Sequence, residues 1–147
     1  MDIKMIRSMW EEDCVIPKAH LDETSRNTPA LHAKYLSMLS NASLKLKDAE
    51  FKQKALMLDK WKWYNGKMSQ EEVERLGWEP DPFNGLKILK GEMEHYVEAD
   101  PELIESEARI TYLKECIDTL SEIINNLNWR HQTIKNMIDY KKFEAGF

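Results

Sequence analysis

The chain has 147 residues, of which 42% are hydrophobic and 32% charged, with a formal net charge of −5. This length corresponds to one ordinary domain, and the composition predicts a folded, helix-rich protein and excludes intrinsic disorder. The sequence shows no leader peptide and no apolar run near the roughly 18 residues of a membrane span, so we expect a cytosolic protein. Cys14 and Cys116 belong to no paired motif, which indicates free thiols in a reducing compartment.

The charge is unevenly distributed along the chain. Residues 41–67 contain seven lysines and three acidic residues, whereas residues 68–122 contain fifteen acidic and five basic residues. A division into blocks of opposite sign predicts two surfaces with different partners. The overall acidity therefore does not exclude nucleic acid as a partner of the basic block.

The first predicted element is a short amphipathic helix over residues 2–13, carrying Ile3, Ile6 and Trp10 at helical spacing. Thr28-Pro29 is the next start signal, a hydroxyl N-cap followed by proline at the first helical position. From there we expect one helix of roughly 37 residues, about three times the ordinary length, up to Asn65-Gly66. One face repeats every four and three residues and predicts a packing seam: Tyr35, Leu39, Ala42, Leu46, Ala49, Gln53 and Leu56.

Residues 65–85 are predicted to connect two long helices. The capping box Ser69-x-x-Glu72 should open one or two helical turns that end at Gly77. Residues 79–85 contain two prolines and an Asn-Gly pair, which are typical of a loop. A short helix is expected over residues 90–98.

Asp100-Pro101 starts the last helix, which has the clearest hydrophobic repeat in the sequence. Its length of about 40 residues corresponds to about 60 Å, too long for its own chain to cover fully, so we expect self-association. His131 falls on the repeat and is interpreted as a polar seam residue, while three nearby asparagines mark a place where the helix can bend. The predicted oligomerisation residues are Ile110, Leu113, Ile117, Leu120, Ile124, Leu127, Ile134 and Ile138.

These elements predict an all-α fold, an elongated hairpin of long helices with coiled-coil-like packing that self-associates into a homo-oligomer. We expect one structural domain with two parts. Residues 1–85 form an N-terminal helical part that contains a DNA-binding segment at 45–67, and residues 86–147 form a C-terminal part that drives oligomerisation.

Residues 58–67, Leu-Asp-Lys-Trp-Lys-Trp-Tyr-Asn-Gly-Lys, are the most distinctive stretch for function. They combine three aromatic rings and three lysines with a single acid. Single-stranded nucleic acid offers bases that stack on rings and phosphates that pair with ammonium groups. The pattern of lysines is equally typical of a solvated helix face. Together with the rings it predicts weak, salt-sensitive, sequence-independent binding of single-stranded DNA, strengthened by repetition in an oligomer.

Helical geometry divides this segment. At 100° per residue, Trp61 shares a face with Lys54, whereas Trp63 and Lys60 lie nearer the Leu56 seam. The pattern favours a core position for Trp63 and an exposed one for Trp61, and it leaves open whether Trp63 and Tyr64 contact DNA. The predicted DNA-binding residues are Lys54, Lys60, Trp61, Lys62 and Lys67.

No pattern of catalytic or metal-binding residues stands out. The four histidines form no His-x-x-x-His pair, and neither cysteine has a partner at ligand spacing. Gly66-Lys67-Met68-Ser69 fails the phosphate-binding loop motif, because Trp61 and Met68 replace its glycine and hydroxyl residue. We expect no enzyme activity, no metal and no cofactor.

Four stretches together resemble the UvsY family of recombination mediators from T-even-like bacteriophages. They are residues 29–36 (Pro-Ala-Leu-His-Ala-Lys-Tyr-Leu), 60–67, 98–104 (Glu-Ala-Asp-Pro-Glu-Leu-Ile) and 142–147 (Lys-Phe-Glu-Ala-Gly-Phe). The resemblance covers nearly the whole chain. Lys60 matches one basic DNA-contacting position of the family motif, and Lys67 matches another basic position. Two positions differ: Leu58 stands where the family has a basic residue, and Lys62 stands where it has an acidic residue.

The resemblance implies a non-enzymatic protein that binds single-stranded DNA and loads the phage recombinase onto it, helping to displace the phage single-strand-binding protein. It also implies a ring of about six or seven subunits in the cytoplasm of the infected bacterial host. The alternative is a coiled-coil scaffold or adaptor without DNA binding, in which the acidic 68–122 region engages a basic partner. A change of fluorescence on adding oligonucleotide distinguishes the two hypotheses.

Overall fold

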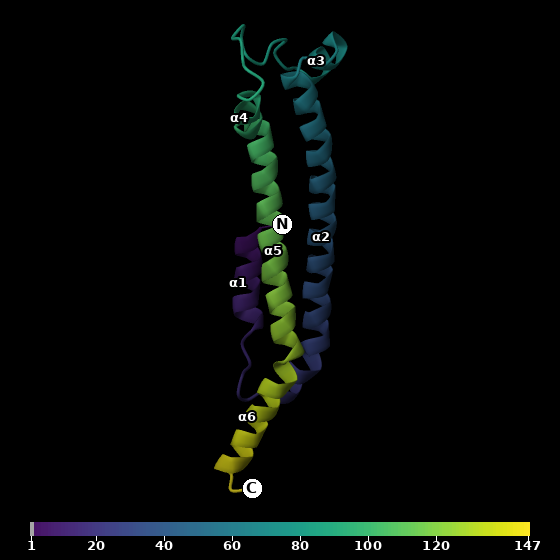
Figure 1. Ribbon diagram of the computed structural model, residues 1–147. Coiled ribbons are helices and arrows are strands. Elements are labelled where there is room, and N and C mark those ends of the chain that lie inside the picture. Colours follow the sequence, from purple (N-terminus) through teal and green to yellow (C-terminus); the bar gives the residue numbers. More distant parts are fainter. Residues whose placement is uncertain (1) are drawn as a thin grey trace. The chain divides into compact units, whose positions relative to one another are not determined.

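The computed structural model describes residues 2–147, and within this range all regular structure is helical. The helices are α1 (Ile3–Asp13), α2 (Leu21–Tyr64), α3 (Gln70–Leu76), α4 (Met93–Glu98), α5 (Pro101–Asn128) and α6 (Arg130–Glu144) (Figure 1). The all-α prediction is therefore confirmed. By their contacts the residues form two compact units, the first made of the chain up to Lys45 with residues 112–147, the second of residues 46–111.

The first unit contains the larger hydrophobic core. Here α1 lies beside the second part of α5 (Figure 1), and the first part of α2 completes the core. The fully or almost fully buried members are Ile6, Tyr35, Ala42, Cys116, Leu120, Ile123 and Leu127. Tyr35 donates a hydrogen bond of 2.7 Å to Asp13, so the polar end of this buried ring has a partner.

The second unit holds the remainder of α2 and the first part of α5, with α3 and α4 between them in sequence. Gln53 of α2 donates to Glu107 of α5 at 2.8 Å, and Tyr64 donates to Asp100 at 2.6 Å. Residue numbers rise along α2 as they fall along α5, so the two helices run antiparallel in this unit.

The predicted small helix from Ser69 to Gly77 is confirmed: Ser69 Oγ accepts from the backbone N–H of Glu72, and Gly77 takes the left-handed conformation at φ = 72°.

The predicted start of the second helix is wrong. α2 begins at Leu21, so Pro29 lies inside it, and the Thr28 hydroxyl donates to the Thr24 carbonyl instead of capping. Pro29 is on the exposed side of the helix. The two extra turns bury Leu21, and burial of a leucine (about 1.5–3 kcal/mol) offsets most of the cost of an internal proline (about 3 kcal/mol).

The predicted unbroken last helix is also wrong, because it is divided at Trp129 into α5 and α6. The N–H of Trp129 bonds to the carbonyl of Asn126, three residues back, so the helix tightens where the asparagines lie. Arg130, just after the break, is 4% exposed and donates to the carbonyls of Asp13 and Val15. His131, expected on the seam, is exposed and has its ring Nδ1 3.0 Å from the Asn128 carbonyl oxygen.

The residues predicted for oligomerisation occupy different environments within one chain. Ile110, Leu113, Leu120, Leu127 and Ile134 are at most 5% exposed, so they supply the core of the subunit itself. Two others, Ile117 and Ile124, pack partly buried against that core. Ile138 remains 39% exposed. Of the eight, only this last side chain is largely open to another subunit.

Candidate nucleic-acid interface

The second unit presents two opposite sides of α2. The seam side carries Ala49, Gln53 and Leu56, which are buried or half-buried, as predicted. The other side carries Phe51, Lys54, Leu58 and Trp61, all of them exposed. Because α2 continues without a break to Tyr64, helical spacing decides which residues of the segment 58–67 face outward within the helix.

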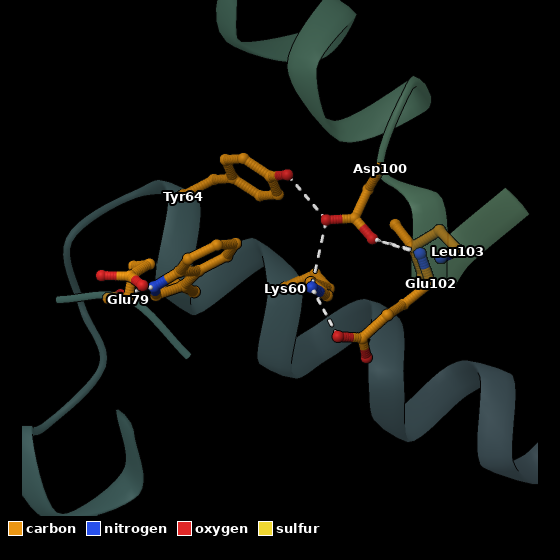
Figure 2. A network of polar contacts seen from close by, with 7 residues as sticks. Lys60, Tyr64, Glu79, Asp100, Glu102 and Leu103 are labelled. Carbon is orange, nitrogen blue, oxygen red and sulfur yellow. Dashed lines mark hydrogen bonds and ion pairs between the residues drawn. The ribbon is translucent and has the colours of Figure 1, made fainter. Parts of the chain in front are cut away.

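Lys60 lies on the inward side and is not open to DNA. Its side chain is only 4% exposed, with Nζ 3.1 Å from Oδ2 of Asp100 and 3.5 Å from Oε1 of Glu102 (Figure 2). The same ammonium lies 4.1 Å from the ring centroid of Trp78 and 4.8 Å from that of Trp63. The predicted role of Lys60 as a phosphate contact is therefore corrected to a structural one, because two carboxylates and two rings already surround its charge.

Asp100 is the centre of this buried network. Its Oδ2 accepts from Tyr64 and pairs with Lys60, while its Oδ1 accepts from the backbone N–H groups of Glu102 and Leu103 at the start of α5 (Figure 2). Burial opposes ionisation of the carboxyl, but the hydrogen bonds from Tyr64 and Lys60 outweigh it and hold the pKa of Asp100 below its usual value. Burial, with the bond to Asp100, raises the pKa of Tyr64. One carboxylate thus caps α5 and ties it to α2.

Aromatic rings extend the network into the loop that follows α3. Trp63 lies 5.1 Å from Trp78 and 5.0 Å from Tyr64, measured between ring centroids, and its indole N–H donates to the Glu79 carbonyl at 2.8 Å. Tyr64 in turn contacts Phe83 at 5.8 Å. Both Trp63 and Tyr64 therefore belong to the packed interior of this unit, as the seam pattern favoured for Trp63.

The exposed part of the segment gathers at the end of α2. Trp61 is 47% exposed, and Nζ of Lys67 lies 4.6 Å from its ring centroid. Lys67 reaches this position because Gly66 takes φ = 68° and the Lys67 N–H bonds back to the Lys62 carbonyl at 2.8 Å. Lys62 itself is half-exposed. The Trp61 ring and the Lys67 ammonium thus lie together at one helix end, next to the backbone of Lys62.

The structure brings together three of the five predicted DNA-binding residues, Trp61, Lys62 and Lys67. Lys54 lies two turns earlier on the same exposed side of α2, where its Nζ is 5.9 Å from the Phe51 ring centroid. Lys60 is separated from them by the helix. The sequence contained a signal for its burial, because position 60 is the next step of the repeat after Leu56. No comparable signal in the sequence pointed to Asp100 or Trp78 as neighbours of Lys60.

Two further properties of the described residues bear on partners. From Asp2 to Phe147 no three His, Cys, Asp or Glu side chains come together as a metal site. Among the helices in this range, none is both long enough and apolar enough to cross a membrane.

Comparison with known proteins gives consistent results over almost the whole chain. The model of the family described as "Recombination, repair and ssDNA binding protein UvsY" matches residues 9–147. The recombination protein uvsY of Enterobacteria phage T4 is 21% identical over 146 residues, 99% of each chain. Two crystal structures of the bacteriophage T4 recombination mediator protein UvsY align with TM-scores of 0.80 and 0.79 at 20% and 19% identity, covering 99% and 98% of this chain and 98% and 99% of theirs. This structural likeness shows that the fold is shared.

Proposed function

The chain belongs to the UvsY family of recombination, repair and single-stranded-DNA-binding proteins, and from this we propose that it is a recombination mediator. In this proposal it binds single-stranded DNA, loads the phage recombinase onto that DNA and helps to displace the phage single-strand-binding protein. It does so without catalysing a reaction, in the cytoplasm of the infected bacterium. The observation that carries the DNA-binding part is the exposed Trp61 ring with the Lys67 ammonium 4.6 Å from its centroid.

The proposed contacts follow from the chemistry of a single strand. A base stacks on the Trp61 ring, and phosphates pair with the ammonium groups of Lys54, Lys62 and Lys67. Lys60 contributes indirectly, because its ion pair with Asp100 holds the end of α2 from which Trp61 projects. Stacking is independent of base identity and phosphate pairing depends on salt, so binding is sequence-tolerant and salt-sensitive.

Self-assembly makes such a small site effective. We propose a ring-like homo-oligomer of about six or seven subunits, in which coiled-coil-like contacts of the C-terminal part join neighbours. Exposed apolar side chains on α6 support this: Ile138 is 39%, Tyr140 62% and Phe143 77% exposed. Repetition of the DNA site around the ring raises the overall affinity through effective concentration.

A salt titration of oligonucleotide binding tests the proposal. We expect the double variant Lys62→Gln/Lys67→Gln to bind a labelled oligothymidylate more weakly, with a salt slope smaller by about 1.4, since each phosphate contact on a single strand contributes ~0.7. The matched control is Lys87→Gln/Lys90→Gln, two exposed lysines in the loop before α4. Equal slopes for the two double variants would refute this site, and a parent protein that binds no oligonucleotide would favour an adaptor role.

A further inference from the structure

A second exposed aromatic ring lies on the same helix as Trp61. Phe51 is 62% exposed, and Nζ of Lys54 lies 5.9 Å from its ring centroid. The pair repeats the arrangement of Trp61 with Lys67, at 4.6 Å. Both ammonium groups are within about 6 Å of a ring, the range of cation–π attraction. Each exposed ring of this face therefore has its own lysine.

The two pairs lie along one side of α2. At 100° per residue, Phe51, Lys54, Leu58 and Trp61 fall within an arc of about 80°, opposite the seam that faces α5. Ten residues separate the two rings, which corresponds to about 15 Å along the helix axis. Leu58, between them, is 53% exposed and adds apolar surface without charge. The rings and lysines thus form a continuous exposed surface, called the lane below. It is defined by five residues: Phe51, Lys54, Leu58 and Trp61 on α2, with Lys67 just after the helix.

We propose that Phe51 is a second base-stacking residue, so that single-stranded DNA runs along α2 from Trp61 to Phe51. One base stacks on Trp61 and a later one on Phe51. The ammonium groups of Lys67 and Lys54 turn from the rings to the phosphates beside those bases. This inference rests on the proposed function and extends the site from the helix end to about three turns of its surface.

The charges of the lane favour a nucleic acid over a protein helix as the ligand. The range 51–67 contains five lysines and a single acidic residue, Asp59. Lys60 is buried against Asp100 and Lys52 pairs with Asp48. Among the described residues of this range, the cations that remain free of an acidic partner are those of Lys54, Lys62 and Lys67. Polyanions are attracted to such a surface at long range. Flat rings spaced along a basic groove or face are also the usual means of holding single strands without reading their sequence.

Three substitutions at one position test the role of the ring in the full-length protein. Phe51→Leu keeps an apolar side chain but removes the aromatic face, Phe51→Tyr keeps the face, and Phe51→Ala removes both. Leu89→Ala is the control, since Leu89 is 73% exposed and lies outside the lane. The probes are a labelled oligothymidylate and an abasic strand of the same length, titrated by fluorescence anisotropy at several salt concentrations, with light scattering to record oligomer mass.

We expect Phe51→Leu and Phe51→Ala to weaken oligothymidylate binding by between about 5- and 150-fold, which corresponds to the loss of one stacked base. The salt slope should not change, because no phosphate contact is removed. Phe51→Tyr and Leu89→Ala should bind like the parent, and all four variants should bind the abasic strand like the parent.

The inference is overturned if Phe51→Leu binds oligothymidylate normally while Trp61→Ala is impaired. It is also overturned if Phe51→Leu alters the oligomer mass, which would place the ring between subunits. Failure of the parent to bind either strand refutes the proposed function itself.

Discussion

Lys60 and Asp100 form a buried ion pair, 3.1 Å between Nζ and Oδ2, that joins the end of α2 to the start of α5. Both side chains are at most 4% exposed. A buried charge is tolerated only when it is paired and hydrogen-bonded, and here Tyr64, Glu102 and two backbone N–H groups complete the arrangement. The pair therefore fixes the geometry of the second unit next to the exposed Trp61 and Lys67.

Removing one partner of this pair should be more harmful than removing both. We expect Lys60→Met to lower the free energy of unfolding by about 3 kcal/mol, because it leaves the Asp100 carboxylate buried without its cation. Adding Asp100→Asn should recover part of this loss, since asparagine can still cap α5. Urea unfolding followed by tryptophan fluorescence measures the effect near Trp63 and Trp78. Lys62→Met serves as the control, and an equal loss in that variant would contradict the argument.

Acid should destabilise the protein through two carboxylates. Burial opposes ionisation of Asp13 and Asp100, but hydrogen bonds from Lys34 and Tyr35, and from Tyr64 and Lys60, hold both pKa values below the usual 3.8. A carboxyl whose pKa is lower in the folded chain stabilises the fold above its unfolded pKa, and this contribution is lost as the pH falls through the folded pKa. We expect the free energy of unfolding to decrease progressively below about pH 5. Asp100→Asn should show a shallower decrease, and a curve parallel to that of the parent would exclude this carboxyl as a cause.

Arg130 should anchor the region around the break between α5 and α6. Its guanidinium donates to the Asp13 carbonyl at 3.0 Å from Nη1 and to the Val15 carbonyl at 3.4 Å from Nη2. Lysine cannot donate in this forked geometry, so Arg130→Lys should lower the free energy of unfolding by about 2 kcal/mol. Arg109→Lys, at an exposed position, should change it by no more than about 0.5 kcal/mol. Urea denaturation of the two variants compares them directly.

Trp61 should act through its aromatic face. We expect Trp61→Ala to weaken binding of a labelled oligothymidylate by between about 5- and 150-fold, while Trp61→Phe retains most of the affinity. Neither change should alter the salt slope, because no phosphate contact is removed. Fluorescence anisotropy at increasing salt tests both statements. A lower slope for Trp61→Ala, with Lys67 displaced from its place over the ring, would show that the ring acts only by positioning the lysine.

Much of the local structure could be predicted from the sequence because its signals act over a few residues. Ser69, Glu72 and Gly77 define α3 through caps that involve their own neighbours. The alternation of four- and three-residue steps marked the buried side of α2 from Tyr35 to Leu56. Its next step is position 60, yet Lys60 was predicted to contact DNA because of its charge, and the structure buries it. The two helix ends that were predicted wrongly, at Thr28-Pro29 and at Trp129, are places where burial of Leu21 or of Arg130 prevails over a local preference.

The sequence by itself determined the helical class, the resemblance to a family and the outward position of Trp61, because periodicity and motif order are properties of the chain alone. Only the tertiary structure decided the roles of the lysines. Lys60 and Lys62 are two residues apart and carry the same charge, yet one is buried against Asp100 and the other is half-exposed. Helical spacing turns position 60 inward, but the carboxylate of Asp100 that pairs with the buried Lys60 comes from a distant part of the sequence. The local pattern does not reveal which acid will meet which base.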